Sequence, residues 1–178
     1  MYISMVRIKG SETYAQHQAI WSLFPNSPDR KRDHLFRVEN VSGSVSTVIL
    51  QSSTQPKSST VADVLQSKIF SLSVQVGTSY RFKLVANPTK RCSKSKAIID
   101  IQTEEDRVAW LQNKLSGANV TVTSMDDELI KSEKCKCSRY VTYEGVIHVT
   151  DSVQIYNAVV MGVGRKKHAG AGLLSLAK

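Results

Sequence analysis

The order of strand and helix signals repeats once along this chain, and that repetition constrains its fold more than any other feature. In the first half, strand-type runs and amphipathic segments follow one another as strand, helix, strand, strand, helix, strand. The second half shows the same order. This order is typical of the ferredoxin-like βαββαβ unit. We therefore predict an α+β chain of two tandem ferredoxin-like domains, similar in topology to RNA-recognition motifs, at residues 1–76 and 77–178.

The spacing of apolar residues places the elements of each half. In the first half it predicts strands at 2–8, 34–40, 44–51 and 68–74, a helix between Ser11 and Pro25, and a short helix at 61–66. In the second half it predicts strands at 79–87, 118–125, 139–149 and 172–177, and helices at 104–115 and 151–162. We expect Asp151 to cap the last helix, the acidic run 126–128 to form a turn, and His34 to lie near the surface.

The chain is strongly basic, with a formal net charge of +9. Its cations gather in four predicted loop regions, at Arg30–Arg32, Lys90–Lys96, Lys131–Arg139 and Arg165–Lys167. Any one cluster could be a solvated surface, but four favour a nucleic-acid partner. Only 7% of residues are aromatic, and the base-stacking run of RNA-recognition motifs is missing. Contact through basic loops and phosphates is therefore expected, rather than stacking on a sheet face.

Several other classes of protein fit the sequence poorly. No apolar run approaches the ~20 residues of a membrane span, and MYISMVRIKG is unlike a signal peptide, so we expect a cytoplasmic protein without a membrane partner. Of the three cysteines, Cys135 and Cys137 could form half of a zinc site. No second pair of ligands completes that site. We therefore expect free thiols and no metal site.

The glycine-rich segment GVGRKKHAGAG (Gly162–Gly172) has two interpretations. Its glycines can turn backbone N–H groups toward an anion while its Arg and Lys side chains supply charge, or it can be a plain turn between helix and strand. It lacks the Walker pattern, and it follows a helix and precedes a strand, which is the reverse of the dinucleotide-binding order. We therefore expect no nucleotide cofactor.

Tyr14 and His17 lie three residues apart, so their side chains are neighbours on one face of the first predicted helix. They could belong to a core stripe with Trp21 and Phe24, or they could form a site where proton transfer takes place near neutral pH. No cluster of acidic residues and histidines suggests a metal nuclease. If the protein cuts RNA, the 2′-hydroxyl can attack the adjacent phosphate, and Tyr14, His17 and Lys167 have the chemistry for an acid, a base and a cation.

Several separate segments of the chain resemble one family. They keep their order and spacing along nearly the entire chain: YAQHQAIWSLFPNSPDRKRDHLFRVE (14–39), VANP, VAWLQNKL, YEGVIHVTD and the closing GVGRKKHAGAGLLSLA. On these segments the chain resembles the CRISPR-associated endoribonucleases of the CasE subfamily.

The resemblance implies metal-independent cleavage of precursor CRISPR RNA at the 3′ base of each repeat stem-loop, leaving a cyclic phosphate and a 5′-hydroxyl. It places the catalytic histidine on His17, the helper tyrosine on Tyr14 and the loop lysine on Lys167. It also implies a basic hairpin that enters the major groove of the stem. We interpret the glycine-rich loop as an RNA-backbone clamp. The RNA-binding residues would be Lys131, Lys134, Lys136, Arg139, Gly162, Gly164, Arg165, Lys166 and His168.

The same resemblance implies partners. The enzyme would stay on its product, the CRISPR RNA, as a subunit of a Cascade-type effector complex of a type I-E system, or of a type IV complex. The alternative is a subunit that binds the repeat stem-loop without cutting it while another nuclease cleaves.

Overall fold

The computed structural model describes residues 1–27, 29–131 and 137–178, which form two compact units. The first unit comprises Met1–Ser71 together with Lys167–Gly170. The second comprises Leu72–Lys166 and Ala171–Lys178. The division into folding domains at residues 76 and 77 stays a prediction. Among the described residues, no helix has both the length and the apolar character needed to cross a bilayer.

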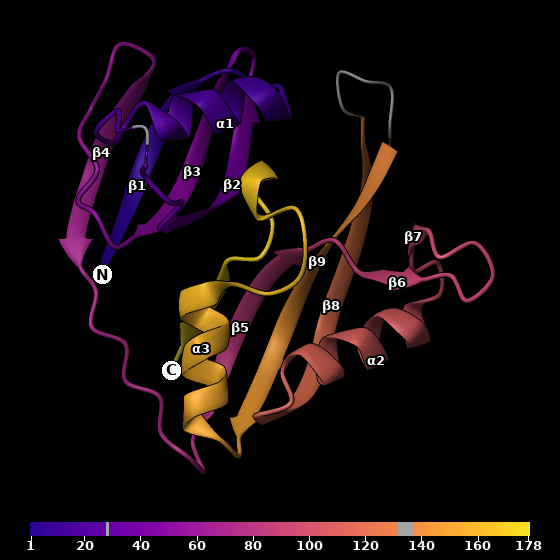
Figure 1. Cartoon of the computed structure of the whole chain (residues 1–178). Coiled ribbons are helices and arrows are strands. Elements are labelled where there is room, and N and C mark those ends of the chain that lie inside the picture. The colour runs from indigo at the N-terminus through magenta and orange to yellow at the C-terminus, as the bar shows by residue number, and fades with distance from the viewer. Residues whose placement is uncertain (28, 132–136) are drawn as a thin grey trace. The chain divides into compact units, whose positions relative to one another are not determined.

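The first unit is an antiparallel sheet with one helix on one of its faces (Figure 1). Its elements are β1 (Tyr2–Lys9), α1 (Thr13–Trp21), β2 (His34–Ser42), β3 (Val45–Ser52) and β4 (Ala62–Ile69). The strands lie in the order β2-β3-β1-β4, which is the strand order of a ferredoxin-like sheet. The core is formed by Val6, Ile8, Ala19, Ile20, Leu23, Phe24, Phe36, Val48, Leu50 and Ala62.

Helix α1 is held against the sheet by a buried glutamine. The Nε2 of Gln16 donates to the Ser46 hydroxyl at 3.1 Å and to the Ser11 carbonyl at 3.0 Å. Glu12 takes the N-cap position of α1, and its side chain makes no capping bond. The helix also ends at Trp21, before the expected stop at Pro25, because Leu23 and Phe24 continue as tighter turns with N–H bonds three residues back.

The predicted helix at 61–66 and strand at 68–74 are wrong. A single strand, β4, spans Ala62–Ile69 and pairs with β1 on the edge opposite to β3. Ala62 is buried in the core and Val64 packs against it. A helix there would leave β1 as an unpaired sheet edge, so tertiary pairing outweighs the weak local helical spacing.

The second unit has the full ferredoxin-like set of two helices on one sheet (Figure 1). Its elements are β5 (Ser79–Ala86), β6 (Thr89–Arg91), β7 (Ile98–Asp100), α2 (Glu104–Lys114), β8 (Ala118–Lys131), β9 (Cys137–Val149), α3 (Ser152–Met161) and β10 (Leu174–Ala177). The 3₁₀ turn η1 (Lys167–Ala169) lies between α3 and β10 in the sequence. Residues 167–170 of this stretch pack with the first unit. The main sheet has the order β10-β5-β9-β8, and β6 pairs with β7 as a separate short hairpin.

Both helices of the second unit bury an apolar side against the sheet. Leu111 of α2, its C-cap residue Leu115, and Ile155 and Val159 of α3 join one core with the sheet residues around Tyr143. The Asp151 carboxylate accepts from the backbone N–H groups of residues 153 and 154, which confirms the predicted cap.

The acidic run 126–128 lies inside strand β8, so the predicted turn is wrong. The β8 and β9 strands form one long antiparallel ladder in which Asp127 stands opposite Val141 and Lys131 opposite Cys137. Three consecutive carboxylates disfavour a strand by local preference, but Asp127 forms ion pairs with Arg107 and Arg139 that compensate its charge.

Candidate active site

The outward side of α1 carries Tyr14 and His17. The residues that α1 buries are Gln16, Ala19 and Ile20, whereas Tyr14 is 53% exposed and His17 is half-buried. The interpretation that both side chains belong to the apolar core is therefore wrong for Tyr14. His17 is only half-buried and is not among the core residues of this unit. These two side chains lie on the part of the helix surface where a ligand can reach them.

The central contact of the candidate site joins His17 to the turn η1. The Nδ1 atom of His17 lies 3.0 Å from the backbone carbonyl oxygen of His168, and the two imidazole rings meet edge to face with centroids 6.0 Å apart. A carbonyl oxygen can only accept a hydrogen bond, so Nδ1 must carry the proton. Neutral His17 then holds its free lone pair on Nε2, and that nitrogen is the one left to exchange protons with a substrate.

Tyr14 is oriented by a neighbour one helical turn away. Gln18 donates from Nε2 to the Tyr14 hydroxyl oxygen at 3.0 Å. The phenol therefore accepts from the protein and keeps its own hydrogen to donate to another acceptor. The sequence reasoning missed Gln18, although its i+4 spacing from Tyr14 was a usable signal.

The glycine-rich loop is closed by its own backbone. Val163 N–H donates to the Gly172 carbonyl at 2.8 Å, and Ala171 N–H donates to the Lys166 carbonyl at 3.3 Å. At Gly170, φ is 83°, and an added Cβ would lie 3.3 Å from the Phe36 ring. Glycine thus lets the backbone of the tip approach β2 closely, which holds the His168 carbonyl in place for His17.

The predicted loop residues are distributed over this closed turn. Lys167 and His168 lie in η1 and belong to the first unit together with α1. Arg165 is exposed, Lys166 is half-buried with φ of 60°, and Gly162 ends helix α3. At Gly164, an added Cβ would contact the Trp110 ring at 3.0 Å, so this glycine serves packing within the second unit.

A cluster of aromatic rings packs around His34 at the C-terminal end of α1. Trp21 meets the His34 ring edge to face at 5.1 Å, Phe24 stacks on the same ring at 5.1 Å, and the Arg30 guanidinium lies 4.2 Å from the Phe24 ring centre. His34 is only 4% exposed, so its predicted surface position is wrong: the aromatic rings enclose it. Burial, helped by the charge of Arg30, lowers the pKa of His34 to about 4, so this histidine is neutral near pH 7.

Arg30 itself is held by Asp33. The two side chains form an ion pair, and the Thr54 hydroxyl and backbone N–H also donate to the Asp33 carboxylate. Burial acts to raise the pKa of Asp33, but the Thr54 hydrogen bonds and the Arg30 charge lower it. Arg30 therefore has a structural partner within the first unit.

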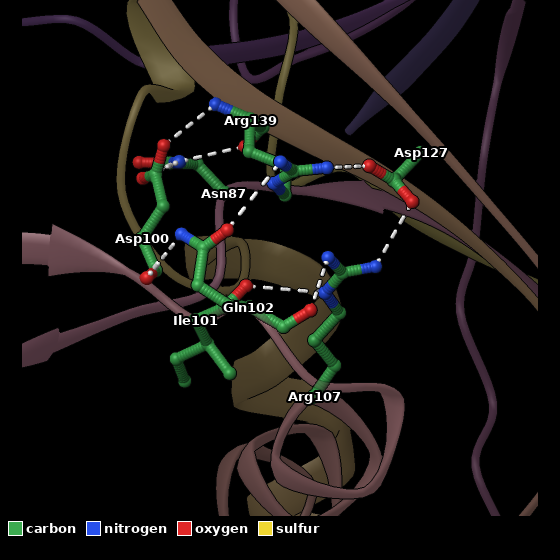
Figure 2. Close-up of polar contacts among 7 residues, drawn as sticks. All are labelled: Asn87, Asp100, Ile101, Gln102, Arg107, Asp127 and Arg139. Atoms are coloured by element: carbon green, nitrogen blue, oxygen red, sulfur yellow. Dashed lines mark hydrogen bonds and ion pairs between the residues drawn. The ribbon is translucent and has the colours of Figure 1, made fainter.

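The predicted basic hairpin is only partly described. Lys134 and Lys136 lie outside the described residues, and Lys131 is the last residue of β8. Arg139 lies near the start of β9 and takes part in a polar network shown in Figure 2. Its guanidinium pairs with Asp127 and donates to Gln102 at 3.5 Å.

The same network contains a buried arginine that the sequence reasoning missed. Arg107 is 4% exposed and donates to the carbonyls of Ile101 at 3.1 Å and Gln102 at 2.7 Å, and to Asp127 at 3.0 Å. Burial acts to raise the pKa of Asp127, but hydrogen bonds from Arg139 and Arg107 lower it. The carboxylate therefore stays charged between the two guanidinium groups.

The described residues contain no group of three or more His, Cys, Asp or Glu side chains arranged to hold a metal.

Comparisons with known proteins show the family of this chain. A family model described as “CRISPR associated protein” matches residues 3–178. The chain belongs to this family. The CRISPR-associated chain is 34% identical to the CRISPR system Cascade subunit CasE of Escherichia coli (strain K12), over 99% of each chain. It is 27% identical to the CRISPR-associated endoribonuclease Cse3 of Thermus thermophilus, over 92% of this chain and 89% of that protein.

The fold of this CRISPR-associated protein has a close counterpart among solved structures. The crystal structure of the CRISPR-associated protein Cas6e from Escherichia coli K-12 matches it with a TM-score of 0.84 and 33% identity, covering 99% of each chain. The predicted fold class of tandem ferredoxin-like units and the resemblance to the CasE subfamily are both confirmed.

Proposed function

We propose that this protein is the endoribonuclease that cuts precursor CRISPR RNA at the 3′ base of each repeat stem-loop. The contact between His17 Nδ1 and the His168 carbonyl carries the proposal, because it presents Nε2 as the proton-exchanging atom of an accessible histidine. The relatives named as an endoribonuclease and as a Cascade subunit support the same activity and the same assembly.

The proposed reaction is an intramolecular transesterification. The 2′-hydroxyl loses its proton as its oxygen bonds to phosphorus, and the bond from phosphorus to the 5′-oxygen breaks as that oxygen gains a proton. The products are a 2′,3′-cyclic phosphate and a 5′-hydroxyl. His17 Nε2 performs one of the two proton transfers, Tyr14 assists at the other, and Lys167 stabilises the charge on the phosphorane.

We propose further that no metal takes part and that the protein stays on its product as a subunit of a Cascade-type or type IV effector complex in the cytoplasm. The groups named above supply a base, an acid and a cation from the chain itself. The Cascade subunit at 34% identity supports the assembly.

The experiment is a cleavage assay on the repeat RNA of the neighbouring CRISPR array, with EDTA present and with the ends of both products identified. We expect one cut at the 3′ base of the stem, a cyclic phosphate and a 5′-hydroxyl. Binding of the hairpin without cleavage would select the non-catalytic repeat-binding subunit instead. Strong inhibition by EDTA would contradict only the proposal that the reaction is metal-free, not the cleavage itself.

A further inference from the structure

The short hairpin β6–β7 (Thr89–Asp100) has no part in the proposed active site, yet it carries one of the four basic clusters. Its cations are Lys90, Arg91, Lys94 and Lys96. All four residues are exposed. The turn between the strands is ordered by Cys92 N–H, which donates to the Ala97 carbonyl at 2.8 Å, and by Lys96 N–H, which donates to the Cys92 carbonyl at 3.0 Å.

Within the described ranges, most of this charge has no acidic partner. Lys90 pairs with Asp106 at 3.1 Å. Arg91, Lys94 and Lys96 form no ion pair with any residue of the described ranges. Three unpaired cations within six residues repel one another, so the fold gains little from this clustering and a bound anion would relieve the repulsion.

The β6–β7 hairpin is hydrogen-bonded to the β8–β9 hairpin at Arg139, close to the first residue of β9 (Figure 2). Asp100, the last residue of β7, accepts from the Arg139 backbone N–H at 2.8 Å and from the Asn87 side chain at 3.0 Å. The same Asn87 amide donates to the Arg139 carbonyl at 2.7 Å and is 2% exposed. Buried, satisfied polar networks of this kind hold backbone segments in one arrangement.

Arg107 connects the residues that follow β7 to strand β8. Its guanidinium binds the carbonyls of Ile101 and Gln102, which directly follow β7, and also binds Asp127 on β8. The short hairpin and the long hairpin therefore form one rigid corner in the second unit. An RNA stem held by the long hairpin would meet the short hairpin at a fixed position.

We propose that the β6–β7 hairpin is a second RNA-binding element, which grips the phosphate backbone of the same repeat stem through Arg91, Lys94 and Lys96. The inference rests on the proposed function, because it takes the repeat stem-loop as the ligand. Backbone contact fits the chemistry, since these side chains are flexible cations without an aromatic platform among them, and phosphate contacts set register and affinity rather than sequence. The Ser93 and Ser95 hydroxyls add neutral donors between the cations.

The test compares two charge-matched variants of the full-length protein, both carrying His17→Ala so that the RNA stays intact. The hairpin variant is Arg91→Gln/Lys94→Gln/Lys96→Gln. The control is Lys57→Gln/Lys68→Gln/Lys178→Gln, which removes three exposed cations elsewhere. Binding of repeat RNA is measured over a series of salt concentrations.

We expect the hairpin variant to bind ~10-fold or more weakly at about 0.1 M salt, with the slope of log K against log salt reduced by about 2 to 3. The control should change the slope much less.

Equal slopes and affinities for the two variants would overturn the proposal. So would unchanged RNA affinity combined with lost assembly with the other complex subunits, which would make the hairpin a protein-docking element. Binding without cleavage by the wild type would refute only the enzymatic function, and the comparison of slopes would still decide the role of the hairpin. Failure of the wild type to bind the repeat RNA would overturn both proposals.

Discussion

The Nδ1 atom of His17 donates to the backbone carbonyl of His168, 151 residues later in the sequence, across 3.0 Å. This bond fixes the tautomer of the imidazole and joins helix α1 to the turn that also carries Lys167. The three residues proposed for catalysis thus lie on two elements of the first unit, although one of these elements comes from the C-terminal part of the chain.

Replacing Tyr14 by Phe removes the hydroxyl that Gln18 orients and leaves the ring in place. We expect the single-turnover cleavage rate to fall about 10²-fold while RNA affinity is kept, since the phenol hydrogen serves a proton transfer rather than binding. Tyr156→Phe, at an exposed tyrosine of α3, is the control and should cleave at the wild-type rate. A wild-type rate for Tyr14→Phe would remove this residue from the mechanism.

Replacing Lys167 by Ala removes the cation proposed to stabilise the phosphorane. We expect a loss of roughly 10²-fold in single-turnover rate, with part of the rate restored in Lys167→Arg because the charge returns. Lys178→Ala, at the exposed last residue of the chain, should leave the rate unchanged. If Lys167→Ala cleaved as fast as Lys178→Ala, another group would have to stabilise the phosphorane.

Stability should fall as the pH is lowered from about 6.5 to about 4, because of His34. The unfolded chain binds a proton on this side chain near its ordinary pKa of 6.5, whereas burial keeps the folded form neutral until about 4. The difference corresponds to about 3 kcal/mol of unfolding free energy, which is fully present above pH 6.5 and is lost across this window.

The measurement is urea unfolding of the wild type and of His34→Gln at several pH values. The variant should show a flatter dependence between about pH 6.5 and 4, whatever its stability at neutral pH. Carboxylates with a lowered pKa, such as Asp127, act at lower pH, because their stabilisation is lost only as the pH falls through a folded pKa below 3.8. Parallel curves for the wild type and His34→Gln would contradict the assignment.

Gly145 occupies a point of β9 where no side chain fits. A Cβ there would lie 2.1 Å from the Thr121 carbonyl oxygen and 3.0 Å from the Phe82 ring, beside the irregularity in β8 between Val122 and Ser124. We expect Gly145→Ala to cost about 1–3 kcal/mol or more, which thermal unfolding would show as a lowered Tm. Asn119→Ala, at an exposed position of β8, should stay within about 0.5 kcal/mol of the wild type. Equal Tm values for the two variants would refute this packing account.

The sequence predicted most elements of the fold because local periodicity and long-range pairing agree there. They disagree at 61–66, where the spacing suggests a helix but β1 requires a partner strand. They also disagree at the acidic run in β8, where Asp127 is compensated by Arg107, an arginine 20 residues earlier in the chain. Contacts of this kind have no signature in a local pattern.

The candidate site shows the same division. The helical spacing placed Tyr14 and His17 on one face, but it left open whether that face is buried. The exposure of Tyr14 answers this question, and it depends on Gln16, a polar residue, turning inward to bind Ser46. His34 is the converse case: a polar residue at a strand start is enclosed by Trp21 and Phe24 because the chain turns back after α1.

The most direct test of the account is the single-turnover cleavage rate of His17→Ala on the cognate repeat RNA, measured beside His148→Ala. His148 is an exposed histidine of β9 that bonds to Ser79 and lies on the second unit. We expect a loss of about 10²–10⁴-fold for His17→Ala with RNA affinity retained, and no loss for His148→Ala. Cleavage by His17→Ala at the wild-type rate would contradict it.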